Sequence, residues 1–333
     1  MPAGGHPSEV LFDSGAQPLV LPVCDHYAGR EPLIRKSLAL QARLGPLFDV
    51  TADCEDGAEV GHEAAHARMV GALVASPENR FGRMGVRIHD SRSRHWHGDL
   101  ETIIGGAGER LAYVALPKVE DFAAVERVAS AIDDLSQQAG VRRQLPIHVS
   151  IETHGGLRAV PEIAAHPRVE CIAFGLMDYV SGYHGALPAS AALSPGQFEH
   201  PLVRRAKAEI AVASHAAGKV PAHNPCTDVR RPGTAGEDAR RAALEYGFTR
   251  MWSIHPSQIG PIVAALTPEP ASIRAAAEIL LAARAAGWGA ILHDGLQLDR
   301  SAYRYWWGVL RRAQAAGAEL PADARAAFFE PIH

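Results

Sequence analysis

The chain of 333 residues lacks the patterns that mark several protein classes. Its four cysteines are far apart in the sequence, which argues against a disulfide framework. Its 17 histidines form neither an HExxH motif nor a Cys/His spacing typical of zinc sites. A formal net charge of -4 argues against a nucleic-acid protein, and no apolar stretch is long enough to span a bilayer. We therefore expect a soluble protein of the reducing cytoplasm, with neither nucleic acid nor a membrane as partner.

The sequence does contain a regular alternation of strand-like and helix-like segments. Eight apolar runs end in polar or glycine-bearing loops, near residues 18–25, 47–54, 84–89, 111–118, 146–152, 169–178, 219–224 and 250–255. Segments with helical periodicity lie between many of them, at 31–43, 63–75, 121–138, 197–217 and 236–246. Such alternation predicts a parallel sheet with helical crossovers, and eight units predict a (β/α)₈ TIM barrel. A doubly wound open sheet is the alternative, but no Gly-x-Gly-x-x-Gly follows the first predicted strand.

The pattern changes after Pro268 and Pro270, where two alanine-rich or tryptophan-bearing helices are predicted around a short hydrophobic segment. We therefore expect a C-terminal helical arm or lid, packed on the barrel or on a neighbouring subunit. The expected divisions are a loose N-terminus at 1–16, the barrel at 17–267 and the C-terminal extension at 268–333.

A pair of acids is the most informative feature of the predicted barrel. Glu152 closes the fifth strand-like run and Asp178 the sixth, and glycine-bearing loop sequence adjoins each of them. Carboxylates at the ends of adjacent strands repel one another and lose solvation, so a hard divalent cation such as Mg²⁺ is the economical compensation, with Mn²⁺ as the alternative ion. The competing interpretation is that each acid separately caps the helix after its strand.

Other charged side chains are predicted at the same end of the barrel. Glu55 and Asp56 follow the second strand, Arg87 ends the third and Lys118 follows the fourth. Several acids with a few bases in one mouth suit a metal-chelated 2-oxo or 2-hydroxy carboxylate. Structural alternatives remain: Arg87 as the partner of Glu55 or Asp56, one of those acids as a helix cap, and Lys118 paired with Glu55, which we prefer to a Schiff-base role.

Together these segments resemble the HpcH/HpaI aldolase and citrate lyase β-subunit (CitE-like) superfamily, closest in pattern to its malyl-CoA and citramalyl-CoA lyases. The matching segments occur in family order between about residues 18 and 300, and they are Asp53-Cys54-Glu55-Asp56-Gly57, Val86-Arg87-Ile88, Leu116-Pro117-Lys118-Val119-Glu120, Ile151-Glu152-Thr153, Phe174-Gly175 through Asp178, Gly247-Phe248 and Ile254-His255-Pro256-Ser257-Gln258. Singly these motifs are weak, but seven in order are specific.

The resemblance implies a TIM barrel with a C-terminal extension, assembled as a homotrimer or homohexamer. It implies that Glu152 and Asp178 hold Mg²⁺ and that Arg87 binds the oxo-acid oxygens, with Gly175 and Lys118 beside the substrate. The acids matching Glu55 and Asp56 support the metal waters and Arg87. In the malyl-CoA lyase branch an aspartate of the extension reaches a neighbour's site and handles the proton at the thioester carbon, and Asp299 matches it better than Asp294.

The implied reaction is the Mg²⁺-dependent, reversible cleavage of a carbon-carbon bond in a 3-hydroxy-3-carboxy acyl thioester, such as malyl-, citramalyl- or citryl-CoA. Two segments depart from the family pattern: the His- and Arg-rich loop at 89–99, and Pro221-Ala222-His223-Asn224-Pro225 at the seventh strand. The alternative functions are a class II pyruvate-type aldolase acting on free hydroxy-oxo acids, a citrate lyase β subunit served by an acyl carrier, and a non-catalytic oxo-acid-binding homologue.

Overall fold

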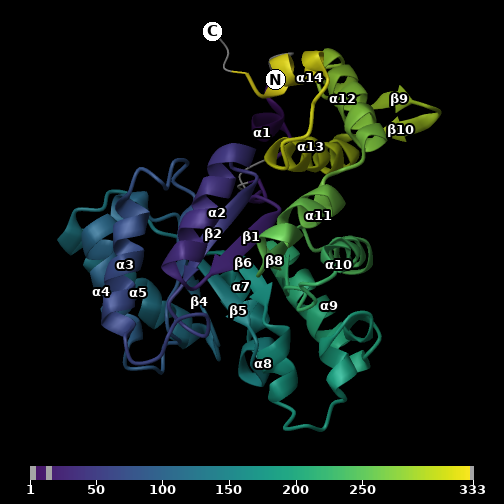
Figure 1. Ribbon diagram of the computed structural model, residues 1–333. Coiled ribbons are helices and arrows are strands. Elements are labelled where there is room, and N and C mark those ends of the chain that lie inside the picture. The colour runs from purple at the N-terminus through teal and green to yellow at the C-terminus, as the bar shows by residue number, and fades with distance from the viewer. Residues whose placement is uncertain (1–4, 13–16, 331–333) are drawn as a thin grey trace. The chain divides into compact units, whose positions relative to one another are not determined.

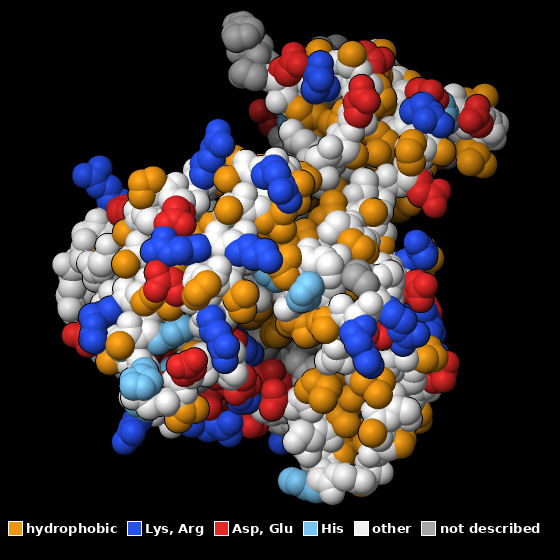
Figure 2. All heavy atoms as spheres, in the orientation of Figure 1, with side chains coloured by type: hydrophobic (Ala, Val, Ile, Leu, Met, Phe, Trp, Pro, Cys, Tyr) orange, Lys and Arg blue, Asp and Glu red, His pale blue; other side chains and the backbone are white. Residues whose placement is uncertain are grey.

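The computed structural model of the chain describes residues 5–12 and 17–330. Its contacts divide the chain into two compact units, Pro22–Leu266 and a second unit made of Met1–Leu21 with Thr267–His333. Over the described ranges no helix is both long and apolar enough to cross a membrane. Figure 2 shows basic and acidic side chains intermingled on the visible face.

The larger unit is a closed parallel barrel in which the eight strands follow one another in sequence order (Figure 1). This confirms the predicted TIM-barrel fold. The strands are β1 (Cys24–Ala28), β2 (Phe48–Asp53), β3 (Met84–Arg87), β4 (Val114–Leu116), β5 (Ile147–Ile151), β6 (Val169–Phe174), β7 (Val220–His223) and β8 (Arg250–Ser253). The α-helices of this unit are α2 (Glu31–Leu44), α3 (Glu63–Ala75), α4 (Trp96–Ala107), α5 (Phe122–Ala139), α6 (His154–Arg158), α7 (Val160–Ala165), α8 (Leu176–Ser181), α9 (Pro201–Ala216), α10 (Pro232–Tyr246) and α11 (Pro256–Leu266).

The first strand lies further along the chain than predicted. The apolar run at 18–25 contains Pro18 and Pro22, which have no N–H to donate to a parallel ladder, and β1 begins only at Cys24. Its polar residues are buried because the barrel interior supplies partners: Asp25 lies 3.0 Å from the Arg250 guanidinium. Hydrophobicity alone therefore placed this strand too early.

The sixth strand is shorter than predicted. It ends at Phe174, and the N–H of Gly175 donates to the carbonyl of Ile151 at 3.0 Å before the chain turns into α8. Asp178 therefore lies in the first turn of α8 and not at the strand end. Negative charge is favoured in the first turn of a helix, so the start of α8 is a suitable place for the Asp178 carboxylate, which lines the cavity described below.

A buried ionic cluster fills the barrel toward the beginnings of its strands. Arg250 is fully buried on β8, and its guanidinium lies 2.6 Å from Asp49 and also donates to the carbonyl of Pro22 at 2.6 Å. Thr51 and Tyr113 both donate hydrogen bonds to Asp25, at 2.7 and 3.0 Å. These polar side chains pair mainly with one another, so we assign them a structural role.

The second unit has its own hydrophobic core. It contains α1 (Pro7–Val10), α12 (Pro270–Ala285), the antiparallel hairpin of β9 (Ile291–His293) and β10 (Leu296–Leu298), α13 (Arg300–Ala315) and α14 (Ala322–Phe328). Val10 and Leu11, from the segment predicted to be a loose terminus, are buried in this core with Tyr303 and Trp307. Asp294 and Gly295 both have positive φ and form the two-residue turn of the hairpin.

Candidate active site

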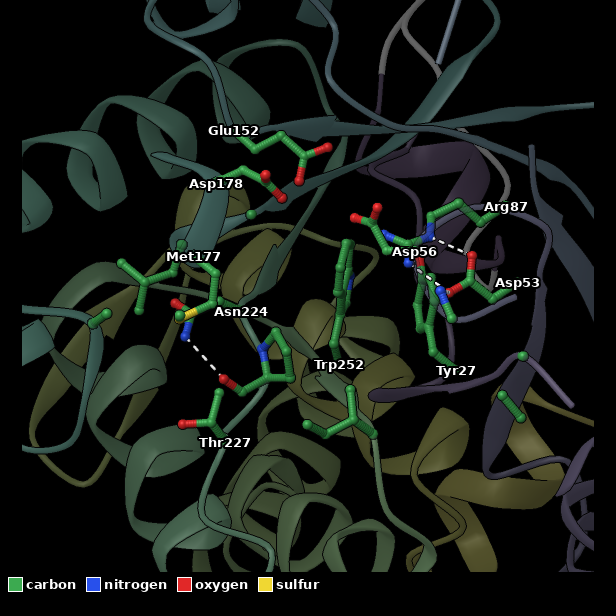
Figure 3. A pocket seen from close by; sticks show the side chains of 18 of the residues that line it. Tyr27, Asp53, Asp56, Arg87, Glu152, Met177, Asp178, Asn224, Thr227 and Trp252 are labelled. Atoms are coloured by element: carbon green, nitrogen blue, oxygen red, sulfur yellow. Dashed lines mark hydrogen bonds and ion pairs between the residues drawn. The ribbon is translucent and has the colours of Figure 1, made fainter. Parts of the chain in front are cut away.

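A cavity of about 380 Å³ opens where the barrel strands end (Figure 3). Its charged wall contains Asp53, Asp56, Arg87, Glu152 and Asp178. Tyr27 and Trp252 form an aromatic floor, with stacked rings 4.5 Å apart. The strand ends of a parallel barrel are where such enzymes place their reactive groups, and most of the side chains predicted from sequence meet here.

Arg87 is held mainly by an acid that is absent from the predicted set. Its Nε and Nη2 donate to the two carboxylate oxygens of Asp53 at 2.8 and 2.5 Å, and Nη1 lies 3.2 Å from Oε2 of Glu55. Asp53 faces Arg87 in the register of β2 and β3, so this pairing required knowledge of register. Although burial opposes ionisation, Arg87 keeps the pKa of Asp53 below its ordinary value.

The loop after β2 is built around the same carboxylate. The backbone N–H groups of Glu55 and Gly57 donate to Asp53 at 3.0 and 2.9 Å. A Cβ atom at Gly57 would lie 2.4 Å from the Asp53 carboxylate, which explains the glycine. The expectation that Glu55 or Asp56 caps the next helix is wrong, because α3 begins only at Glu63 and its N-cap is His62.

Lys118 forms the predicted ion pair with Glu55 and a second one with Asp56. Its Nζ lies 2.7 Å from Glu55 and 3.1 Å from Asp56. Burial would lower the pKa of Lys118, but the hydrogen bond to Glu55 and the nearby charges raise it above its ordinary value. The amine therefore stays protonated, which disfavours a Schiff-base role. Its backbone, at a φ of 50°, directs the N–H to Oε1 of Glu152 at 2.5 Å.

Glu152 is almost completely buried beside Asp178. Burial, with the negative charge of Asp178, raises the pKa of Glu152 to about 8 despite the opposing influence of Arg87. Neither acid is a helix cap: Thr153 caps α6 through its own side chain, and the N-cap of α8 is Gly175. In Figure 3 the two carboxylates point toward one another across the upper wall of the cavity.

Gly175 makes room for the Glu152 carboxylate. A Cβ atom on this glycine would lie 2.0 Å from Oε2 and 2.4 Å from Cβ of Glu152. The backbone at Gly175 is ordinary, with φ of -94°, so close approach and not a left-handed conformation requires glycine here. The residue predicted beside the substrate thus also shapes the acid pair.

The charged groups of the cavity wall and of the side chains paired with it do not balance. Five acids (Asp53, Glu55, Asp56, Glu152 and Asp178) meet two bases (Arg87 and Lys118), which leaves three more negative than positive groups when all are ionised. Over the described ranges, the ion pairs of both bases go to the first three acids, and none joins Glu152 or Asp178. The pair can therefore take up a cation or, without one, keep a proton on Glu152, whose pKa is raised to about 8.

The sequence comparison agrees with the motifs of this site. Residues 46–256 match the model of the HpcH/HpaI aldolase/citrate lyase family. The chain belongs to this family. The L-malyl-CoA/β-methylmalyl-CoA lyase of Cereibacter sphaeroides is 28% identical over 285 residues, which cover 81% of this chain and 88% of the relative. The citrate lyase subunit β-like protein of Mycobacterium tuberculosis is 27% identical and covers 81% of this chain and 89% of its own length. The protein is a lyase.

Two solved structures of similar proteins extend the comparison. A citrate lyase from Burkholderia xenovorans LB400 is 52% identical with a TM-score of 0.85, covering 97% of this chain and 99% of that one. The CitE protein of M. tuberculosis, solved with magnesium, acetoacetate and coenzyme A, is 24% identical with a TM-score of 0.64, covering 89% and 99%. The second likeness supports the barrel fold.

In this lyase the acid pair fits a hard divalent cation. All its side-chain donors are carboxylate oxygens, which Mg²⁺ prefers, and it commonly takes only one or two protein carboxylates with water and substrate oxygens in the other positions. In the described ranges no group of three or more His, Cys, Asp or Glu side chains is arranged to hold a metal. A fully protein-enclosed site of the zinc type is thus not what these residues form.

Asp299 lies in the second unit of the lyase. It is exposed and is the N-cap of α13, and its carboxylate accepts hydrogen bonds from the backbone N–H and the hydroxyl of Ser301 at 2.9 and 2.6 Å. The hydrogen bond from the Ser301 hydroxyl, followed by that from its backbone N–H, keeps the pKa of Asp299 below its ordinary value. Capping accounts locally for this residue, and any part in catalysis needs a test that separates it from capping.

Proposed function

We propose that this protein is a Mg²⁺-dependent carbon-carbon lyase acting reversibly on a 3-hydroxy-3-carboxy acyl thioester, of the malyl-, citramalyl- or citryl-CoA class. The observation that carries the proposal is the buried pair of Glu152 and Asp178, left without a cation of its own while Arg87 lines the same cavity. An anionic substrate entering this site would add negative charge, so a cation must accompany it.

Glu152 and Asp178 would hold the Mg²⁺, which when bound supplies Lewis acidity toward the carboxylate and hydroxyl oxygens of the substrate. Arg87 is oriented by Asp53 and Glu55, and its guanidinium carries five N–H donors. Three of its contacts fix the group, and the remaining N–H groups can donate to the oxygen on which charge develops. Lys118 holds Glu55 in place beneath Arg87.

Cleavage requires three linked changes. The substrate hydroxyl loses its proton, the bond between its carbon and the carbon next to the thioester breaks, and the electron pair of that bond becomes a thioester enolate. The enolate carbon then takes up a proton, which yields an oxo acid and an acyl thioester. We assign this proton transfer to Asp299 of a neighbouring subunit in a homotrimer or homohexamer.

The relatives support a thioester substrate. The named relatives include an L-malyl-CoA/β-methylmalyl-CoA lyase and a citrate lyase, and the 52% identity to the latter favours testing a citryl thioester as the second candidate. A class II aldolase acting on free hydroxy-oxo acids would use the same acid pair but would need neither Asp299 nor a cavity wall for a thioester arm.

The test is an activity screen of the purified protein with malyl-, citramalyl- and citryl-CoA and with free 4-hydroxy-2-oxo acids, each with Mg²⁺ and after chelation. We expect cleavage of at least one thioester, lost in Glu152→Ala and Asp178→Ala. Glu162→Ala, which removes an exposed acid of α7, is the matched control and should keep full activity. Near-native cleavage after chelation, or in either acid variant, would rule out the scheme.

A further inference from the structure

The seventh strand ends in a segment that the proposed reaction does not use. Asn224 follows β7, lines the cavity and is only 1% exposed. Its Oδ1 atom has no hydrogen-bond partner among the described residues. A buried acceptor without a donor costs free energy, so native structures keep few of them and each calls for a reason.

A buried network fixes which atom of Asn224 remains unpaired. Gln197 accepts hydrogen bonds at Oε1 from Nζ of Lys207 at 2.7 Å and from Nδ2 of Asn224 at 3.0 Å. On its other side, Nε2 of Gln197 donates to Ser194 and Asp238 at 2.9 and 3.1 Å. Because the Asp238 carboxylate accepts from Nε2 of Gln197, Gln197 must present its oxygen on the other side, to Lys207 and Asn224. The amide of Asn224 cannot flip without placing two oxygens face to face.

The backbone of Asn224 is held by the same network. Lys207 also donates to Nε2 of His223 at 2.6 Å, and Nδ1 of His223 donates to the carbonyl of Asn224 at 2.9 Å. Lys207 is fully buried in α9 and lies 3.8 Å from the centre of the Phe198 ring. Lys207, His223 and Gln197 are thus positioning residues that fix Asn224 in the cavity wall and leave its buried Oδ1 as the unpaired acceptor of the side chain.

The surroundings of this acceptor indicate the kind of group that would meet it. Met177, Pro225 and Ile254 line the same cavity and form an apolar wall. A chain of methylene groups interrupted by an amide would pack on such a wall and place one N–H against a lone acceptor. The substrate hydroxyl is a poorer match, because it must lose its proton during cleavage whereas an amide N–H keeps its proton throughout.

We propose that Oδ1 of Asn224 accepts a hydrogen bond from a secondary amide N–H in the arm of the thioester substrate, an inference that rests on the proposed function. Asn224 would then select for thioesters whose arm carries an amide close to sulfur. The acid pair binds the other end of the substrate, so the two parts of the cavity recognise separate groups.

The test replaces the N–H on the substrate. Two truncated thioesters of the preferred acid are compared: one of N-acetylcysteamine and one in which an ester oxygen replaces the amide N–H. We expect wild-type kcat/KM to favour the amide by about 3- to 10-fold, the range of one neutral hydrogen bond. Asn224→Ala should reduce this ratio to about 1 while thermal unfolding confirms a folded protein.

Asn79→Ser is the matched control. Asn79 is also a buried asparagine, but it bonds to backbone groups of Val74, Arg83 and Arg110 outside the cavity, so its replacement should lower the melting temperature and keep the ratio. A wild-type ratio near 1, or an unchanged ratio in Asn224→Ala, would overturn the role of Asn224 with the lyase activity intact. Cleavage of free hydroxy-oxo acids with no thioester cleaved would overturn the proposed function itself.

Discussion

Replacing Gly175 by alanine should damage the acid pair without touching either acid. The new Cβ would lie 2.0 Å from Oε2 and 2.4 Å from Cβ of Glu152, while real Cβ contacts are longer than 3.0 Å. The carboxylate alone could rotate away, but the contact with Cβ forces the backbone of β5 or the turn before α8 to move as well. Glu152 must therefore leave its position by an ångström or so.

Two quantities should change. Overpacking of this kind costs about 1–3 kcal/mol in the free energy of unfolding, which lowers the melting temperature by about 2–10 °C for a unit of this size. Disturbing the support of a metal ligand typically weakens metal binding by about 10- to 100-fold. The measurements are thermal unfolding and Mg²⁺ titration calorimetry, with kcat/KM on the preferred thioester.

Gly105→Ala is the control, and it should change the stability in the opposite direction. Gly105 lies in α4, where an added Cβ would have no neighbour within 4 Å. Alanine is favoured over glycine inside a helix by about 1 kcal/mol, so this variant should be slightly more stable and should bind Mg²⁺ normally. Normal Mg²⁺ affinity in Gly175→Ala would refute the conclusion that Glu152, held in this position, is a metal ligand.

Three further predictions concern the charged groups. Burial raises the pKa of Glu152 to about 8, so the metal-free folded protein keeps a proton that the unfolded chain releases above about pH 4.5. The stability of the metal-free protein should therefore fall as pH rises from about 4.5 to 8. Melting curves recorded in chelator should show a smaller fall for Glu152→Gln. Asp299→Asn keeps a good N-cap for α13 but removes the acid, so kcat should fall by about 10²- to 10⁴-fold at an unchanged melting temperature, and unchanged kcat would leave capping as its only role. Arg87→Lys keeps the charge but not the two-point contact with Asp53, so steady-state kinetics should show kcat/KM lower by about 10- to 100-fold, and wild-type kinetics would exclude a guanidinium-specific role.

The barrel was predictable because its signals are local and repeated. Each strand-like run had a helix or a loop after it, and an error at one unit did not alter the count of eight. The bounds of two strands were predicted wrongly because a proline or a glycine interrupted a hydrophobic run. Pro18 and Pro22 removed donors from an apolar run before β1, and Gly175 ended β6 three residues before Asp178. Helix α14 carried too short a pattern to be recognised.

The residues of the site and the pairing of Lys118 with Glu55 were predictable, but the main partner of Arg87 was not. Which acid takes Arg87 depends on the register of β2 and β3, and register places Asp53 directly opposite. The network behind Asn224 joins Gln197, which precedes α9, to Lys207 of α9, Asp238 of α10 and the end of β7, and no local pattern encodes how these segments pack together. Only His223 and Asn224 stood out in the sequence, because they depart from the family pattern. The other members are polar residues that no motif distinguishes.

Register also decides where the metal can bind. If Arg87 faced Glu152, the acid pair would carry its own cation and a divalent ion would be superfluous. Asp53 accepts two hydrogen bonds from Arg87, and Glu55 forms ion pairs with both Arg87 and Lys118. Both bases are therefore paired with acids on the β2 side of the cavity. Glu152 and Asp178 are left on the β5 and β6 side with one backbone N–H from Lys118 to Glu152. The negative charge at the proposed Mg²⁺ site is therefore a consequence of strand pairing. Asp53→Asn frees Arg87 to turn toward Glu152, so it should weaken Mg²⁺ binding measured by calorimetry even though Asp53 is not an expected ligand.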